Sequence, residues 1–203
     1  MPGQIPAGTD VGYTISMFIL ILLVFAQFLL LLASIALVIW VWSIGSRQPV
    51  PYVPTRRYLC KQILDLLELK PNSVFFELGS GDGRLVWEAH EREPLAHVVG
   101  IERRYALWAL SRISRFLRGS PATIEFRRED LRETPLLSAT HVYAFLSSPL
   151  MAELSQKFQR ELHGARLISC DFPLPDRKPD RVITLDKDVG KKIFQKLYVY
   201  NFA

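Results

Sequence analysis

A short segment in the first half of the chain joins an apolar run to three closely spaced glycines. The run covers residues 74–78 and includes the carboxylate Glu77, and Gly79, Gly81 and Gly83 follow at alternate positions. An apolar run that meets a glycine-rich segment predicts a buried strand, a tight turn and a helix start. Glycine tolerates a positive φ and a close backbone approach, and the free N–H groups of a helix start suit a polar or anionic ligand group. The segment therefore predicts a ligand site at the end of a strand.

The glycine spacing distinguishes two kinds of nucleotide site. The dinucleotide fingerprint is G-x-G-x-x-G, whereas this chain has G-x-G-x-G, with Arg84 in the place of the last glycine. With Glu77 the pattern reads E-x-G-x-G-x-G, which resembles motif I of the class I S-adenosylmethionine (SAM) methyltransferases. The resemblance implies SAM as the cofactor, bound by Glu77, Gly79, Ser80, Gly81, Asp82 and Gly83. The alternatives are a plain strand-to-helix connection and an NAD enzyme, which Arg84 disfavours.

Apolar strands and amphipathic helices alternate along the chain after this point. Strands are predicted at 73–78, 97–102, 122–127, 141–146 and 165–170, and helices at about 55–69, from 83, over 105–117 and over 149–163. Two short strands near 182–185 and 196–200 predict a C-terminal antiparallel hairpin. The alternation predicts an α/β fold with a Rossmann-like, doubly wound and mostly parallel sheet.

Acidic residues end two further predicted strands. Ligands in open α/β sheets bind at the carboxyl ends of the strands. Glu102 ends the second strand, where such folds place an acceptor for ribose hydroxyls. Asp130 follows the third strand and resembles the acid that holds the adenine amino group in class I methyltransferases. The alternative is that Glu102 and Asp130 only cap helices or pair with nearby arginines.

Residues 11–46 contain no charged side chain, and residues 15–44 are almost entirely apolar. A membrane span needs roughly 20 apolar residues, and Tyr13, Trp40 and Trp42 have the positions of interfacial aromatics. A cleaved signal peptide would have a basic start, but residues 1–10 contain no Lys or Arg. We therefore expect one retained transmembrane helix over 11–46 that contacts the membrane through 15–44.

The charges around this segment predict its orientation. Asp10 precedes it, whereas Arg47, Arg56, Arg57 and Lys61 follow it. The positive-inside rule therefore predicts a single-pass membrane protein with a cytoplasmic catalytic domain and an external tail over 1–10. All 25 basic residues follow the span, together with 19 of the 20 acidic residues. This modest excess suits an anionic leaflet and is too small to indicate nucleic acid as a partner.

Prolines and cysteines complete the outline of the chain. Three prolines within 49–54 predict a linker over 47–57, which leaves 58–203 as the methyltransferase domain. Cys60 and Cys170 lie far apart, and no C-x-x-C or H-E-x-x-H pattern is present. We therefore expect neither a disulfide framework nor a metal site.

Three segments together resemble one family. They are Pro51–Thr55 (PYVPT), the glycine segment 77–84, and Phe172–Pro175 (FPLP). They look like the small membrane-anchored lysine methyltransferases that modify the ATP synthase c subunit and the adenine nucleotide translocase, with their bacterial relatives. The resemblance covers about 50–203. It implies protein-lysine N-methylation of a membrane-associated substrate, and it places Thr55 beside the SAM site.

The acceptor site is less well defined by the sequence. Ser147, Ser148 and Pro149 follow the fourth strand, where adenine amino-methyltransferases carry Asn/Asp-Pro-Pro-aromatic, so base methylation by that route is not expected. Ser147-Ser148 also departs from the more apolar residues expected for the family. The segment 147–149, Tyr52 and Phe172 are candidates for the acceptor pocket, as is Phe145, and plain packing is the alternative for the aromatics. No residue stands out as a general base.

Two further alternatives stay open from the sequence. The chain could methylate a lipid or a small molecule, or bind SAM as a non-catalytic scaffold, because a fold does not fix a function. Arg112, Arg115 and Arg118 recur at helical spacing. They predict a solvated or membrane-facing stripe, with RNA contact as the weaker interpretation.

Overall fold

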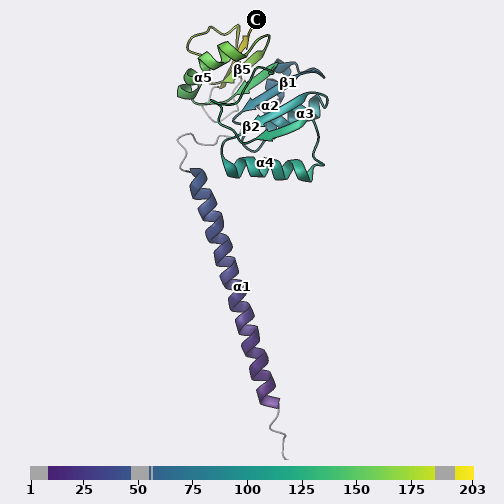
Figure 1. Ribbon diagram of the computed structural model, residues 1–203, viewed down its shortest axis with the longest axis vertical. Coiled ribbons are helices and arrows are strands. Elements are labelled where there is room, and N and C mark those ends of the chain that lie inside the picture. The colour runs from purple at the N-terminus through teal and green to yellow at the C-terminus, as the bar shows by residue number, and fades with distance from the viewer. Residues whose placement is uncertain (1–8, 47–54, 56, 186–194) are drawn as a thin grey trace, which may run out of the picture. The chain divides into compact units, whose positions relative to one another are not determined.

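The computed structural model describes residues 9–46, 55, 57–185 and 195–203. The chain divides into two compact units, Met1–Arg47 and Gln48–Ala203. The first unit contains one described helix, α1 (Thr9–Ser46) (Figure 1). Its stretch Gly12–Trp40 has a mean hydropathy of 2.9 and none of it is buried. By length and composition this helix is able to cross a membrane.

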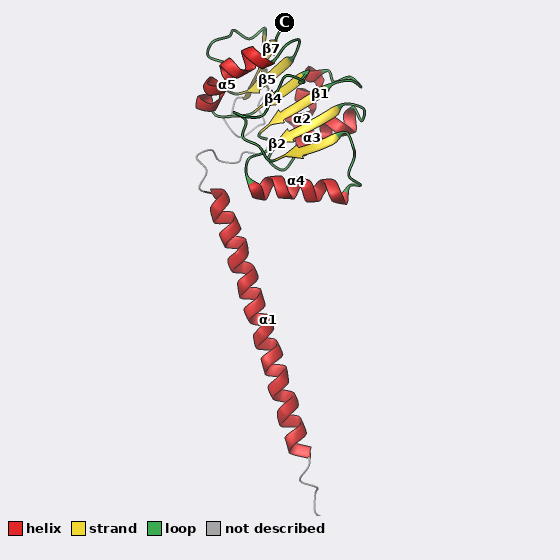
Figure 2. Cartoon of the chain, in the orientation of Figure 1, coloured by secondary structure: helices red, strands yellow, loops and turns green. Residues whose placement is uncertain are grey.

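The second unit is an α/β domain. Its helices are α2 (Arg57–Leu67), α3 (Arg84–Arg92), α4 (Tyr105–Leu117) and α5 (Ser148–Glu161). Its strands are β1 (Val74–Leu78), β2 (His97–Ile101), β3 (Ile124–Arg127), β4 (His141–Ala144), β5 (Arg166–Cys170), β6 (Arg181–Leu185) and β7 (Gln195–Asn201). The described strands form one sheet in the order β3-β2-β1-β4-β5-β7-β6 (Figure 2).

The sheet confirms the fold class predicted from the sequence. Strands β1 to β5 pair in parallel, and β7 pairs antiparallel with both β5 and β6. The predicted C-terminal hairpin is therefore β6–β7, which extends the parallel sheet at one edge. A parallel sheet is buried on both faces, which is why β1, β2, β4 and β5 read as nearly continuous apolar runs.

Two hydrophobic cores cover the two faces of the sheet. One core contains Leu59 and Ile63 of α2 and Leu85 of α3, with Trp108 of α4 packed at its border. The other contains side chains of α5, among them Phe158. The face with α2, α3 and α4 also receives Phe75 of β1, and by strand alternation it receives Glu77 as well. The acidic residue of the glycine segment is thus directed into a core.

The position of β1 in the sheet fixes where a ligand can bind. β1 pairs with β2 on one side and with β4 on the other, so the strand order reverses at β1. Ligands of open α/β sheets bind in the crevice at such a reversal, outside the carboxyl ends of the strands. Because β1, β2 and β3 are neighbours, the residues that follow them lie at one edge. Glu77, Glu102 and Asp130 belong to this edge.

Candidate functional site

The glycine turn after β1 requires glycine at its alternate positions. Gly79, Gly81 and Gly83 have φ values of +81°, +57° and +77°, which side chains with a Cβ rarely adopt. A Cβ at Gly83 would also lie 2.5 Å from Cε1 of Phe126, so packing forbids one there. The N–H groups of Gly79 and Ser80 donate to the Ile101 carbonyl, each at 2.9 Å. The turn is therefore held against the end of β2.

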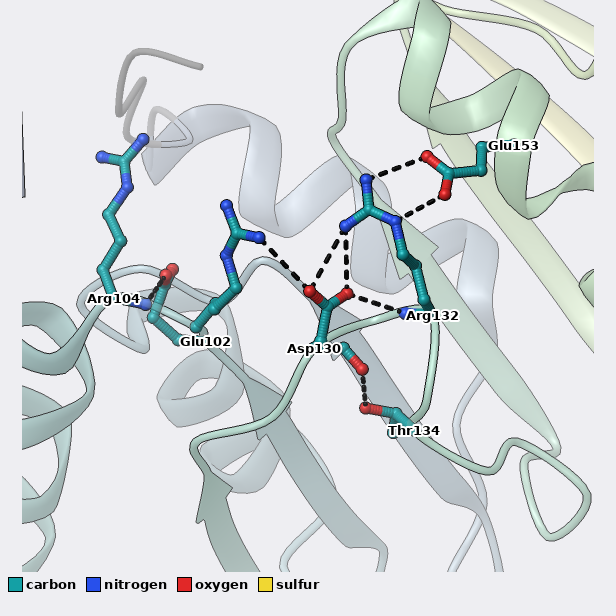
Figure 3. Close-up of polar contacts among 7 residues, drawn as sticks. Glu102, Arg104, Asp130, Arg132, Thr134 and Glu153 are labelled. Carbon is teal, nitrogen blue, oxygen red and sulfur yellow. Dashed lines mark hydrogen bonds and ion pairs between the residues drawn. The ribbon is translucent and has the colours of Figure 1, made fainter. Parts of the chain in front are cut away.

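Glu102 connects the turn to the start of α4. Its carboxylate accepts a hydrogen bond from the N–H of Gly81 at 3.0 Å. It also accepts one from the N–H of Arg104 at 2.8 Å, which Figure 3 shows. Glu102 therefore holds the backbone of Arg104, which is the N-cap residue of α4. A carboxylate has about four acceptor positions, so both oxygens retain capacity for a further donor. A ribose diol at this edge fits that capacity.

Glu77 lies beneath the turn and is almost fully buried. Its carboxylate accepts from the N–H of Val86, in the first turn of α3, while Oε2 has no hydrogen-bond partner among the described residues. Burial raises the pKa of Glu77 well above its ordinary value, and the negative charge of Asp82 raises it further. A buried acid with spare acceptor capacity at a helix start is suited to organise the turn or to meet a polar ligand group.

One buried side chain near Glu77, that of Tyr143, was not found from the sequence. Tyr143 of β4 is the register partner of Glu77, and its hydroxyl faces Thr55 and Cys170. Burial raises the pKa of Tyr143 well above its ordinary value and raises that of Cys170 to about 12. In the sequence Tyr143 is one more residue of an apolar strand. Only the β1–β4 register reveals that it lies beside Glu77.

Thr55 reaches the turn through an arginine. The Asp82 carboxylate pairs with the Arg84 guanidinium, with 2.6 Å between Oδ2 and Nη2. Nη1 of Arg84 donates to the Thr55 carbonyl at 3.0 Å. The structure thus places Thr55 next to the glycine turn, although Tyr52 lies outside the described residues. In the sequence, Arg84 served only to distinguish the glycine spacing from the dinucleotide fingerprint. Its contacts with Asp82 and Thr55 were not predicted.

Asp130 lies between two arginines (Figure 3). Its carboxylate accepts from Nη1 of Arg103 at 3.2 Å and from Nη1 of Arg132 at 3.2 Å and 3.3 Å. The N–H of Arg132 also donates to it and is the main reason why the pKa of Asp130 is lowered. The ion-pair alternative is therefore present here, and the adenine contact of Asp130 stays a prediction.

The acceptor-pocket candidates among the described residues follow β4 and β5 along the chain. Ser147 is the N-cap residue of α5, and Ser148 and Pro149 are exposed in its first turn. A Cβ at Gly79 would lie 3.2 Å from Cδ2 of Leu146, so the segment after β4 abuts the glycine turn.

The two aromatic candidates do not share a face of the sheet. Phe145 packs against the core beneath α2 and α3, whereas Phe172 packs against the core beneath α5. Phe145 and Phe172 therefore do not form one wall of a pocket. The segment 147–149 follows the carboxyl end of β4 and so lies at the same edge of the sheet as the cofactor candidates.

This sheet, with a glycine turn at its reversal point and acids at neighbouring strand ends, defines the class of SAM-dependent methyltransferases. A solved RNA methyltransferase from Salinibacter ruber, in complex with S-adenosyl-L-homocysteine, is 28% identical with a TM-score of 0.65, covering 74% of this chain and 94% of that chain. A solved geranyl diphosphate methyltransferase in complex with SAM has a TM-score of 0.58 at 13% identity, covering 72% of this chain and 85% of that chain. The second likeness concerns the fold alone.

Within this class, residues 77–181 match the sequence model of the ANTKMT methyltransferase domain, and the chain belongs to that family. The adenine nucleotide translocase lysine N-methyltransferase of Mus musculus is 36% identical, over 68% of this chain and 59% of the relative. The lysine N-methyltransferase of the ATP synthase c subunit in Homo sapiens is 31% identical, over 66% of this chain and 56% of the relative. A protein-lysine N-methyltransferase of Saccharolobus islandicus (strain REY15A) is 27% identical, over 68% of this chain and 86% of the relative.

These comparisons confirm the family resemblance seen in the sequence. The chain spans less than two thirds of the length of the mouse and human relatives. The segment that matches the family begins at Glu77 and includes the glycine turn, Glu102 and Asp130. The cofactor of the family is SAM.

Proposed function

We propose that this chain is a membrane-anchored, SAM-dependent protein-lysine N-methyltransferase that acts on a membrane-associated protein. The observation that carries the proposal is the similarity to lysine N-methyltransferases from three organisms over about two thirds of this chain. Two of these relatives are named for a component of ATP synthase and for an adenine nucleotide translocase. An acceptor of that kind, a lysine of a membrane protein, is the substrate class that we propose here.

The residues at the strand ends fit SAM as a ligand. Glu102 would accept from the ribose hydroxyls, and Asp130 would accept from the adenine amino group. The turn formed by Gly79, Ser80, Gly81, Asp82 and Gly83, with Glu77 beneath it and Thr55 beside it, would hold the remainder. When bound, SAM supplies a methyl group made electrophilic by its sulfonium. The protein aligns the acceptor with that methyl, which requires positioning more than acid–base chemistry.

A lysine acceptor must be neutral to attack. The ordinary pKa of a lysine amine is about 10.4, and burial in an apolar pocket favours the neutral form. Ser147 and Ser148, next to the turn, offer hydroxyl oxygens that accept from an amine without adding negative charge. Phe172 would supply apolar surface, as would Tyr52, which lies outside the described residues. This arrangement favours loss of the amine proton to solvent, and we assign no general base.

The membrane anchor is part of the same proposal. The helix over Gly12–Trp40 supports it by length and hydropathy. We propose an external tail over 1–10, a span over 11–46, a linker over 47–57 and a cytoplasmic methyltransferase domain over 58–203. An anchor confines the enzyme and a membrane acceptor to one surface, which raises their effective concentration. That gives a physical reason for the span.

Transfer of radiolabelled methyl from SAM tests the acceptor class. Full-length protein in native membranes is supplied with labelled SAM, and protein, lipid extract and RNA are counted separately. We expect label in the protein fraction, recovered as methyllysine by mass spectrometry. Glu102→Ala should abolish it, while the exposed control Glu133→Ala should not.

Other distributions of the label would contradict the proposal. Label in lipid would favour a lipid acceptor. Label in RNA would favour the activity named for the Salinibacter ruber neighbour. SAM binding without any label would favour a non-catalytic scaffold.

A further inference from the structure

The inward face of helix α4 is fixed by contacts near the cofactor site. Ser111 is fully buried, and its hydroxyl donates to the Gly81 carbonyl at 3.1 Å. Nε1 of Trp108 donates to the Phe126 carbonyl at 3.1 Å. These contacts place the Ser111 side of α4 against the glycine turn and β3. The opposite side of the helix is therefore its outward face.

The outward face of α4 carries large apolar side chains and no charge. The exposed fractions are 59% for Tyr105, 53% for Leu110, 57% for Ile113, 77% for Phe116 and 76% for Leu117. Spacings of three and four residues bring these side chains onto one side of the helix. A solvated helix face carries charged and polar residues, so this strip is not an ordinary solvent-facing surface. We call these five residues the α4 strip.

Arginines border the α4 strip. Residues 103–128 contain seven arginines and one acidic residue, Glu125. The guanidinium of Arg112 lies 5.8 Å from the centre of the Trp108 ring, and that of Arg128 lies 5.5 Å from the centre of the Tyr105 ring. Arg118 covers Trp87 and pairs with Glu91 at the far end of the helix. The helix thus combines an apolar strip with a cationic border.

We infer that α4 is an interfacial helix that docks on an anionic lipid surface, with the α4 strip inserted at the level of the head groups. Helices of this kind combine an apolar face with Lys or Arg at its margins, and they bind through buried apolar area together with attraction to anionic lipids. Contiguous exposed apolar side chains mark such interaction sites. The site goes beyond the proposed function, because it would exist whatever the acceptor is.

Charge and shape favour lipid over the other occupants. A nucleic-acid surface presents its cations outward, with aromatics for base stacking, whereas Leu110, Ile113 and Leu117 are aliphatic and would face phosphates. Arg112 and Arg118 are themselves exposed and lie at the border of the α4 strip. An anionic leaflet complements both the α4 strip and its cationic border, since acyl chains would contact the strip and head-group phosphates would contact the arginines.

Docking through α4 would act on the cofactor edge. The helix starts soon after Glu102, whose carboxylate accepts from the N–H of Arg104. Ser111, on its inward face, holds the Gly81 carbonyl of the turn. A helix that lies on the bilayer would therefore bring the carboxyl ends of β1 and β2 to the membrane surface, within reach of lysines exposed there.

A depth measurement on the full chain tests this inference. Phe116→Cys is labelled with an environment-sensitive fluorophore, in nanodiscs that are either zwitterionic or rich in phosphatidylglycerol. Cys60 and Cys170 are fully buried, so the label goes to the introduced thiol. Asp176→Cys, exposed in the segment after β5, is the matched control label. Since α1 anchors the chain in both discs, only the depth of the label differs between them.

We expect the label at position 116 to shift to the blue in anionic discs and to be quenched by lipid-borne quenchers. The label at position 176 should change in neither disc. High salt should reverse the effect, since it screens exposed charges. Arg112→Gln should lower the docking equilibrium about fivefold, the effect of one basic residue near an anionic surface.

Substitutions without a label separate docking from folding. Ile113→Ser should reduce the shielding of Tyr105 in anionic discs, whereas Leu137→Ser, at a residue exposed elsewhere in the domain, should not. Equal signals from labels at 116 and 176 in both discs would overturn the inference. Shielding of position 116 without quenching by lipid-borne quenchers would also overturn the inference, because a protein would then cover the α4 strip. That protein would be a second copy of this chain if the shielding rose with the concentration of the chain.

Discussion

At the scale of single residues, Glu102 offers the most direct test of the proposed cofactor site. Its carboxylate accepts from the N–H groups of Gly81 and Arg104. Glu102→Ala removes both acceptors and the group proposed for the ribose. Hydrogen bonds to a charged group contribute about 1.5–3 kcal/mol, so we expect SAM affinity to fall by about 10- to 100-fold. Calorimetry on the full-length protein measures this.

The control for this prediction is an acid in the same region that is exposed. Glu133→Ala should leave the affinity for SAM unchanged, because Glu133 lies on the surface after β3. An unaltered affinity in Glu102→Ala, with the fold intact by circular dichroism, would remove Glu102 from the site.

Glu77 predicts a pH dependence of stability. Its folded pKa is raised, by burial first and then by Asp82, above a value near 4.5. The folded protein therefore holds this proton more tightly than the unfolded chain does. Stability contributed by the proton is lost as pH rises from 4.5 through the folded pKa. We expect the free energy of unfolding of Glu77→Gln to decline less over that range than that of the wild type.

Urea denaturation at a series of pH values, without SAM, measures this difference. The exposed control Glu133→Gln should follow the wild-type curve. Parallel curves for Glu77→Gln and the wild type would mean that the Glu77 carboxylate is compensated in the folded protein.

At the scale of elements, the glycine turn and α3 depend on one another. Gly83 is the N-cap of α3, with φ of +77°, and a Cβ there would lie 2.5 Å from Phe126 Cε1. Gly119 has φ of +81° and open space around a Cβ. Gly119→Ala should cost about 1–2 kcal/mol from backbone strain alone. Gly83→Ala should cost about 1–3 kcal/mol more from overpacking.

Chemical denaturation of both variants isolates the packing contribution, since the backbone strain is common to them. Gly83→Ala should also weaken SAM binding, whereas Gly119→Ala should not. Equal destabilisation of the two variants would show that Phe126 moves aside without cost.

The order of elements was predictable because each signal is local. Strands β1 to β5 were predicted from apolar runs that alternate with segments of helical spacing. The predicted strand ends differ from the observed ones by one or two residues, as at 122–127 against Ile124–Arg127. The helix over 105–117 was predicted at its observed bounds. Strand ends are less certain because the last residues pair only when a neighbouring strand is present.

The site was predictable in its acids but not in their partners. Glu77 lies near the end of β1, and Glu102 and Asp130 follow the neighbouring strands β2 and β3, so topology alone brings them to one edge. The contacts of Asp130 with Arg103 and Arg132 depend on side-chain rotamers, which no spacing rule provides. Tyr143 was missed for a related reason, since its position beside Glu77 depends on strand register.

At the scale of the whole molecule, the charges that flank the span predict its orientation. Asp10 precedes the uncharged segment 11–46, and the basic residues all follow that segment. The positive-inside rule then predicts a cytoplasmic methyltransferase domain. We expect protease added outside intact cells or right-side-out vesicles to spare the domain, and protease added to inverted vesicles to remove it.

Reversal of the charge difference makes this prediction sharper. Gln4→Arg and Thr9→Arg add positive charge before the span, and Arg47→Gln and Arg56→Gln remove it after the span. Because orientation follows the difference in Lys and Arg between the two flanks, a substantial fraction of this variant should expose its domain to external protease. A variant with Gln4→Asn, Thr9→Asn, Arg47→Lys and Arg56→Lys keeps the charge difference and controls for substitution at these four positions. If the domain stayed cytoplasmic in the charge-reversed chain, its folding before translocation, and not the flanking charge, would determine the topology.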